Sequence, residues 1–287
     1  MSQNTEISSA QSEFITHLRS RKRASATIVA YGKDIDQLVS FLKDMGKKTM
    51  AEISKDDLLA FLGKLGKDGY TPKSISRKIN SIKTFYRFLK AQSYVVEDPT
   101  VNISHPKYEV KPPRILSRVE YRALRDACRD DARISAIVEL FLQTGLRIGE
   151  LANLKLTDVR DNELQIAAQE SHAQRVVPLN KAAKQAVDRY LETRSKTENP
   201  TLFVTKTGRP LLIRNIRTAI DRYFKLAGIE KAKVNDLRHT FIAHHLASGT
   251  PLTVISKLVG HKRLSTTEKY LEFIKGKAEE NVKLEEL

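Results

Sequence analysis

Four side chains in the second half of the chain predict a particular chemistry. Arg147 lies in the run Thr-Gly-Leu-Arg-Ile-Gly-Glu-Leu, and Arg238, His261 and Tyr270 follow toward the C-terminus. Arginine guanidinium groups bind phosphate oxygens in a bidentate manner and stay charged at every relevant pH. A tyrosine hydroxyl is a competent nucleophile once the charge of its phosphate target is neutralised. Together these residues predict cleavage of a phosphodiester through a covalent link to Tyr270.

The spacing around the two arginines supports this interpretation. Glu150 follows Arg147 by three positions, so it shares a helix face with the guanidinium and could hold it in place. Asn235 and Arg238 have the same separation and project from one side of a helix start, where free N–H groups favour an anion. A single arginine, histidine or tyrosine is more often structural, so the prediction depends on the whole set.

The chain is strongly basic. Its 287 residues include 50 Lys and Arg against 34 Asp and Glu, a net charge of +16. Such an excess points to a polyanionic partner, most often nucleic acid, although it could also serve only to keep the surface soluble. Both halves of the sequence carry the excess, so we expect both to touch the same polyanion.

Targeting and redox signals are few. The polar N-terminus lacks an apolar signal segment, and no apolar run reaches the length of a membrane span. The single cysteine, Cys128, excludes a disulfide framework and a cysteine zinc site. We expect a cytoplasmic protein, without membrane contact, that meets chromosomal or mobile DNA.

Two domains are expected from the distribution of prolines and apolar residues. Helical spacing of apolar positions fills the first part of the chain, and a basic stretch with several prolines, 98–114, interrupts it. We predict an N-terminal helical DNA-binding domain over 1–108, a linker over 109–116 and a second domain over 117–287. The fold should be mainly α, with one small β-hairpin in the second domain.

One N-terminal helix shows a clear apolar stripe. The stripe consists of Ile75, Ile79, Ile82, Phe85 and Leu89. The opposite face carries Arg77, Thr84 and Arg87, flanked by Lys73 and Lys90. We predict phosphate contacts for Lys73, Arg77 and Arg87, with an ordinary solvated surface as the alternative.

Local signals define the elements of the second domain. Ser117 and Glu120 form a capping box, and a helix over 132–144 should stop at Gly145. Two short strands, 163–168 and 174–179, bracket a polar turn and predict a hairpin. Further helices are expected over 181–194, 213–227, 235–248, 252–258 and 266–273.

The motifs together resemble the tyrosine recombinases of the phage integrase family. The arginine run given above is similar to the first arginine box of the family, and Asn-Asp-Leu-Arg-His-Thr-Phe is similar to its second. Leu-Val-Gly-His-Lys-Arg-Leu-Ser-Thr-Thr-Glu-Lys-Tyr resembles the third box with the nucleophile. The segment from Thr27 to Leu89 resembles the core-binding domain of Xer-type recombinases. The resemblance spans nearly the whole chain and implies a core-binding domain followed by a tyrosine-recombinase catalytic domain.

The resemblance also implies roles. Arg147 and Arg238 would bind the non-bridging oxygens of the scissile phosphate, and His261 would donate a hydrogen bond to it. Tyr270 would form a 3′-phosphotyrosyl link, and a 5′-hydroxyl would later reverse the step. Because the link retains the bond energy, no ATP, metal or other cofactor is expected. The partner would be double-stranded DNA, bound by a monomer or dimer that assembles into a tetramer in the synaptic complex.

The hairpin and the second box depart from the family pattern. Glu170 stands where the family usually has a lysine that protonates the leaving 5′-oxygen, and Asn235 stands where it has a histidine. His172 could serve as the general acid instead, although an exposed turn residue is an equal alternative. Arg175 at the end of the hairpin is a predicted DNA contact. His239 follows Arg238 directly, so we expect it to face another direction as a packing or surface residue.

Two other functions stay open at this point. Glu170 and Asn235 would suit a recombinase that has lost catalysis and only binds its site. A DNA-relaxing enzyme of the type IB topoisomerase kind would use similar chemistry without pairing two sites. The complete set of arginines, histidine and tyrosine argues against the first alternative, and the N-terminal segment argues against the second.

Overall fold

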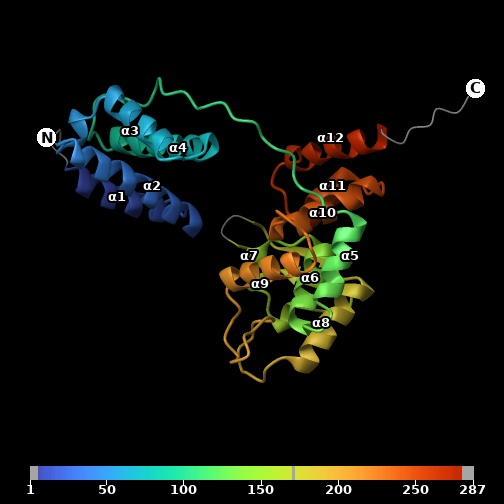
Figure 1. Ribbon diagram of the computed structural model, residues 1–287. Helices are drawn as coiled ribbons and strands as arrows, with labels where there is room; N and C mark the ends of the chain where they lie inside the picture. The colour runs from blue at the N-terminus through green and yellow to red at the C-terminus, as the bar shows by residue number, and fades with distance from the viewer. Residues whose placement is uncertain (1–5, 170–171, 280–287) are drawn as a thin grey trace, which may run out of the picture. The chain divides into compact units, whose positions relative to one another are not determined.

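The computed structural model describes residues 6–169 and 172–279, with the backbone alone for 273–279. The chain divides into two compact units, Met1–Val110 and Lys111–Leu287 (Figure 1). Both units are mainly helical, as predicted. No helix in the described part of the chain has both the length and the apolar character that a membrane span needs.

The N-terminal unit is a helical bundle. Its elements are α1 (Ile7–Ser20), α2 (Ser25–Asp44), the short 3₁₀ helix η1 (Met50–Glu52), α3 (Lys55–Lys67) and α4 (Pro72–Ala91). Ser54 begins α3 with a capping box, and Thr71 caps α4 before a proline at its first position. The bundle encloses the fully buried rings of Phe14, Phe61 and Phe85.

Helix α4 has the two faces that its sequence predicts. Ile79, Ile82, Phe85 and Leu89 are buried, and Ile75 packs against them in part. On the other face, Lys73, Arg77 and Arg87 are exposed. Arg77 also has a partner that the sequence did not reveal, because its Nη2 donates to buried Asp34 at 2.8 Å. The predicted phosphate contacts of these three cations stay predictions.

The C-terminal unit combines helices with a two-stranded sheet. It contains α5 (Arg118–Ala127), α6 (Ala132–Thr144), α7 (Ile148–Ala152), η2 (Leu156–Asp158), β1 (Glu163–Ile166), β2 (Arg175–Pro178), α8 (Lys181–Thr193), α9 (Ile213–Leu226), α10 (Val234–Ala247), α11 (Leu252–Val259) and α12 (Ser265–Glu279). Helix α6 is central and packs against α8 and α10, with Ile137, Leu140 and Phe141 buried (Figure 1).

Two predicted helix boundaries of this unit are confirmed. Ser117 and Glu120 form both hydrogen bonds of a capping box at the start of α5. Gly145 ends α6 with φ of 61°, in the left-handed region that glycine adopts without strain. A Cβ at this position would lie 2.5 Å from the ring of Phe241, so the site also requires the close approach that only glycine allows.

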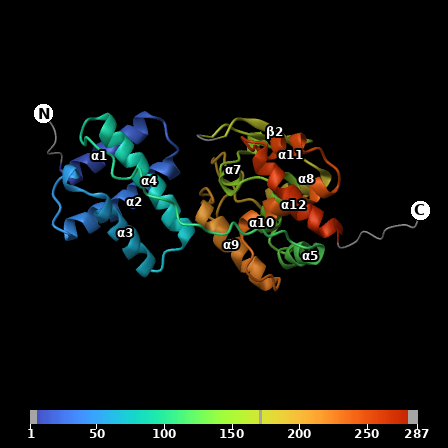
Figure 2. The same cartoon turned by 90° about the horizontal axis from the view of Figure 1, so that it is seen from above.

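The predicted hairpin is present but its strands are shorter. β1 and β2 are antiparallel, with Glu163 opposite Pro178 and Ile166 opposite Arg175. Each strand has four residues, not the six predicted for each. Gln169 and His172 pair separately, through backbone hydrogen bonds of 2.9 and 3.0 Å, so the ladder is interrupted before the turn. Seen from above, β2 lies beside α11 (Figure 2).

Candidate active site

Arg147 and Glu150 form the first part of the site, at the start of α7. The Glu150 carboxylate accepts from the backbone N–H and from Nη1 of Arg147, both at 2.9 Å. The predicted pairing is therefore confirmed. Nη2 of Arg147 donates to the Gly260 carbonyl at 2.8 Å, and a quarter of the arginine side chain stays exposed. The guanidinium is thus fixed on two sides while one part remains accessible.

Arg175 is the second cation on the same carboxylate. Its Nη1 and Nη2 donate to the two Glu150 oxygens at 2.8 and 2.7 Å, and its Nε donates to the Leu258 carbonyl at 2.7 Å. The side chain is only 9% exposed. The sequence predicted a DNA contact for Arg175, and the structure places its side chain inside the site as a partner of Glu150. Its contact with DNA stays a prediction.

The charge of Glu150 is stabilised by these arginines. Burial raises the pKa of its carboxyl, but the hydrogen bonds from Arg175 and Arg147 outweigh burial and lower the pKa to about 2. The carboxylate side chain is 1% exposed, so the pairing takes place in a low-dielectric interior. Glu150 of α7 therefore links Arg147, at the start of that helix, to Arg175 of β2 and orients both guanidinium groups.

Replacing Glu150 with glutamine should remove an acid-dependent part of the stability. A folded-state pKa below the unfolded value means that the contribution is present above about pH 4.5 and is lost as the pH falls toward about 2. The full effect is about 3 kcal/mol. Between about pH 6 and pH 3, urea unfolding should show that wild type loses about 2 kcal/mol more than Glu150→Gln. Equal losses in the two proteins would contradict this assignment.

Arg238 is the most deeply buried cation of the site. It projects from α10, is 5% exposed, and donates from Nη1 to the Gly145 carbonyl and from Nη2 to the Val259 carbonyl at 2.7 Å. Both carbonyls stand at helix C-termini, where the helix dipole stabilises a cation. Burial, and then the charge of Arg147, lower the pKa of Arg238 to about 9. Among the described residues, no carboxylate pairs directly with this guanidinium.

His261 lies directly after Gly260, which ends α11 with φ of 66°. Its Nδ1 is 2.8 Å from Oγ1 of Thr267, a fully buried residue of α12 that sequence reasoning did not single out. When the threonine hydroxyl donates to Nδ1, Nε2 carries the proton and is a hydrogen-bond donor. Burial, and then the charges of Arg238 and Arg147, lower the pKa of His261 to about 4. The ring is therefore neutral at pH 7.

Tyr270 of α12 lies within electrostatic reach of Arg238. Its side chain is 7% exposed and belongs to a small cluster with Phe241 and Val259. Burial raises the pKa of its hydroxyl, and the Arg238 charge opposes that effect. The hydroxyl is 2.6 Å from Nδ1 of His239. His239, which was expected to be a packing or surface residue, packs its ring against Tyr270, because α12 packs against the side of α10 that His239 faces.

The C-terminal unit therefore gathers two arginines, a neutral histidine and a tyrosine from distant parts of the sequence. The model of the phage integrase family matches residues 114–275, and the model of its N-terminal SAM-like domain matches 12–93. The chain belongs to the phage integrase family. It is a tyrosine recombinase, and the helical N-terminal unit is the SAM-like domain of that family.

Named relatives of this recombinase agree with the family. Tyrosine recombinase XerD of Caulobacter vibrioides is 33% identical over 87% of this chain and 87% of its own length. Tyrosine recombinase XerC of Bacillus licheniformis is 31% identical over 90% of this chain and 89% of its own. The crystal structure of XerA recombinase covers 97% of this chain and all of its own, with 26% identity and a TM-score of 0.54. A lambda integrase dimer bound to a COC′ core site has the same fold, with 17% identity and a TM-score of 0.77 over 99% of this chain and 80% of its own.

Three predicted site residues of the recombinase lie at the edge of the cluster or beyond it. His172 is partly buried, and its Nδ1 has no hydrogen-bond partner among the described residues. Burial, and then the nearby charge of Arg147, lower the pKa of His172. Asn235 is exposed in the first turn of α10. Glu170 lies outside the described residues.

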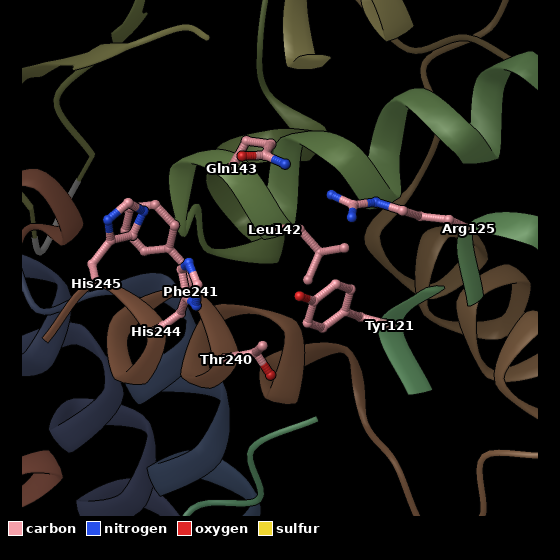
Figure 3. A pocket seen from close by; sticks show the side chains of 8 residues that line it. All are labelled: Tyr121, Arg125, Leu142, Gln143, Thr240, Phe241, His244 and His245. Atoms are coloured by element: carbon pink, nitrogen blue, oxygen red, sulfur yellow. The ribbon is translucent and has the colours of Figure 1, made fainter. Parts of the chain in front are cut away.

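A small cavity of about 170 Å³ lies elsewhere in the catalytic unit of the recombinase (Figure 3). It is lined by Tyr121, Arg125, Leu142, Gln143, Thr240, Phe241, His244 and His245. None of the arginines, the histidine or the tyrosine of the cluster lines it. Helix α10 thus contributes Arg238 and His239 to the site and its C-terminal histidines to the cavity.

Proposed function

We propose that this recombinase cleaves and rejoins double-stranded DNA at specific sites through a 3′-phosphotyrosyl link to Tyr270. The observation that carries the proposal is Arg238, a buried guanidinium bound by two carbonyl oxygens beside Arg147 and Tyr270. A buried cation is strongly destabilising unless an anion pairs with it. A DNA phosphate supplies that anion and at the same time is the target of the tyrosine.

Each residue has a role in this reaction that its contacts support. Arg147 and Arg238 bind the non-bridging oxygens and stabilise the charge that develops on them in the transition state. His261 donates from Nε2, because Thr267 holds its Nδ1. Tyr270 attacks phosphorus and releases a 5′-hydroxyl, and attack by a 5′-hydroxyl reverses the step. The phosphotyrosine retains the bond energy, so rejoining needs no ATP.

The proposal extends to the assembly. Lambda integrase is described as a dimer bound to a COC′ core site and as a tetramer bound to a Holliday junction. We propose that this recombinase likewise binds duplex DNA through both units, with Lys73, Arg77 and Arg87 of α4 on phosphates. Exchange between two duplexes then needs four protomers. Chromosomal or mobile DNA as substrate implies action in the cytoplasm.

A suicide-substrate experiment tests the proposal. Duplexes that bind the protein are selected from a random pool, and a nick is placed beside the cleavage position so that the released 5′-hydroxyl fragment diffuses away. We expect an adduct that survives denaturation when the strand is labelled at its 5′ end, and none when it is labelled at its 3′ end. The two arginines supply the charge stabilisation, so the adduct should also form in excess EDTA. Binding without any adduct on such duplexes would favour a protein that only holds its site.

We also propose that His172 protonates the leaving 5′-oxygen. Burial, and then the neighbouring cations, lower the pKa of the His172 ring in the free protein, and a phosphate bound near Arg147 would raise it. Asn235 would add a hydrogen bond to the phosphate, since an amide can donate but carries no charge. Glu170, at the usual lysine position, would oppose the reaction by its negative charge.

His172→Ala should slow cleavage of an ordinary phosphodiester by at least about 10²-fold, the typical contribution of a general acid. His172→Ala should cleave a substrate with sulfur at the 5′-bridging position almost as fast as wild type does, because a thiolate leaves without protonation. Glu170→Ala serves as the comparison and should be neutral or activating. Equal slowing on both substrates would mean that His172 does not donate this proton.

A further inference from the structure

The hydroxyl of Tyr270 has one specific neighbour. Nδ1 of His239 lies 2.6 Å from it, and the two ring centroids are 5.7 Å apart. Among the described residues, this hydroxyl makes no other hydrogen bond. His239 belongs to none of the roles assigned above, although it touches the atom that we propose as the nucleophile.

The environments of the two rings determine their protonation states. Burial, assisted by the charge of Arg238 and opposed by Asp236, lowers the pKa of His239. Burial raises the pKa of Tyr270. The imidazole is therefore neutral and the phenol keeps its proton. In the tautomer that carries its proton on Nε2, Nδ1 is the acceptor and the phenol O–H donates to it.

We infer that Nδ1 of His239 accepts the proton of Tyr270 when the tyrosine oxygen attacks phosphorus; this rests on the proposed function, in which Tyr270 is the nucleophile. An unperturbed tyrosine is ionised in only about one molecule in a thousand at pH 7. Burial reduces that fraction here, so the attack benefits from a base already in contact with the hydroxyl.

The proton and the bonds balance in both directions. During cleavage, the bond between phosphorus and the Tyr270 oxygen forms, the bond to the 5′-oxygen breaks, and the phenol proton moves to Nδ1. The leaving oxygen takes its proton from the donor on the hairpin side. During rejoining, the 5′-hydroxyl gives its proton back to the hairpin-side group and its oxygen bonds to phosphorus. The bond between phosphorus and the Tyr270 oxygen breaks, and the His239 imidazolium returns its proton to that oxygen.

Helix α10 explains how one segment supplies two functions. Successive residues of a helix point about 100° apart. Arg238 reaches the carbonyls of Gly145 and Val259, whereas His239 reaches Tyr270 on α12. Arg238 also acts on the hydroxyl directly, because its charge lowers the pKa of Tyr270. The hydroxyl therefore contacts its proposed proton acceptor and is within electrostatic reach of Arg238.

Two variants separate proton transfer from simple positioning. His239→Asn places an amide oxygen near the position of Nδ1, so it can accept the hydrogen bond but takes up no proton at neutral pH. His239→Ala removes both functions. His245→Asn is the matched control, because this last histidine of α10 contacts Phe241 and lines the separate cavity (Figure 3).

The rate of adduct formation on the suicide duplex is the main measurement, at saturating protein and in a single turnover. We expect His239→Asn and His239→Ala to be slower than wild type by at least about 10²-fold at pH 7, with unchanged DNA binding and a normal rate for His245→Asn. The rates of both slow variants should rise about tenfold per pH unit, as the phenolate fraction does. A fluorotyrosine of lower pKa at position 270 should accelerate His239→Asn more than it accelerates wild type.

Other charged and titratable groups around His239 could also affect how the rate depends on pH. Asp236 and Arg238 act on His239 from α10, Tyr270 contacts it from α12, and His239 in turn lowers the pKa of His261. A change in His261 would appear in both His239 variants and in DNA binding. Only loss of the proton acceptor makes the rate follow the pKa of the residue at position 270.

Three outcomes would overturn the inference. A wild-type rate in His239→Asn would mean that the contact only positions the hydroxyl. A rate above wild type in either variant would mean that the hydrogen bond to His239 keeps the Tyr270 hydroxyl from attacking phosphorus. Rates that ignore both pH and the fluorotyrosine would mean that the proton goes elsewhere. If Tyr270→Phe forms no adduct, Tyr270 remains the nucleophile and these results bear on His239 alone. If Tyr270→Phe still forms an adduct, the proposed function itself is contradicted, because another group attacks the phosphate.

Discussion

Replacement of Tyr270 by phenylalanine should abolish the covalent protein–DNA adduct and leave DNA binding close to the wild-type level. The change removes one oxygen, the proposed nucleophile, and keeps the ring in its cluster with Phe241 and Val259. Binding should persist because the positive charge that attracts duplex DNA is spread over the whole chain. A denaturing gel and a mobility-shift assay on the same labelled duplex measure the two effects.

Tyr223→Phe is the matched control for this variant. Tyr223 is also 7% exposed, and its hydroxyl lies 3.2 Å from Asp131, a residue outside the arginine, histidine and tyrosine cluster. Loss of that buried hydroxyl should affect stability slightly and the adduct not at all. Persistence of the adduct in Tyr270→Phe, with the control also active, would show that another side chain attacks the phosphate.

Local features of the site could be predicted from the sequence because they depend on neighbouring residues. The capping box of Ser117 and the left-handed stop at Gly145 need only a few positions of the chain. The pairing of Arg147 with Glu150 spans one helical turn. Spacing within a helix fixes such contacts before any tertiary structure is considered.

The partners that come from distant segments could not be predicted in this way. Arg175 approaches Glu150 from β2, and the carbonyls that hold Arg238 belong to Gly145 and Val259. These contacts depend on how α6, α11 and the hairpin pack together, which no local pattern specifies. The strands of the hairpin are also shorter than predicted, and Gln169 and His172 pair apart from the main ladder.

His239 has a contact with Tyr270 that local reasoning could not predict. It does point away from Arg238, as adjacent helix positions must. The direction away from Arg238 is occupied by α12 and its tyrosine, and spacing within α10 does not specify that packing. A partly buried histidine that follows the second arginine directly is therefore worth testing whenever the nucleophile lies on a helix packed against it.

Arg238→Ala should slow adduct formation by at least about 10²-fold, or about 2.7 kcal/mol of transition-state stabilisation. The lost guanidinium is 5% exposed and acts where solvent screens little, so its charge has a large effect on the phosphate. Arg238→Lys should recover only part of the rate, because an ammonium is a point charge and cannot hold two carbonyls while binding a phosphate in a bidentate manner. Single-turnover rates on the suicide duplex, with binding measured separately, give both values.

The structural part of this effect needs its own control, since Arg238 also holds the carbonyls of Gly145 and Val259. Arg194 offers the comparison, because its guanidinium donates to the carbonyls of Leu202, Asn199 and Thr201 at 2.8 to 3.0 Å. Arg194→Ala should lose stability in urea by a similar mechanism but keep its cleavage rate at temperatures where it is folded. Arg238→Ala should lose the rate under the same conditions, while its DNA affinity falls much less, because the whole basic surface shares the binding. If affinity and rate fall by the same factor, Arg238 only positions the DNA, and the charge stabilisation of the transition state must come from Arg147 and His261.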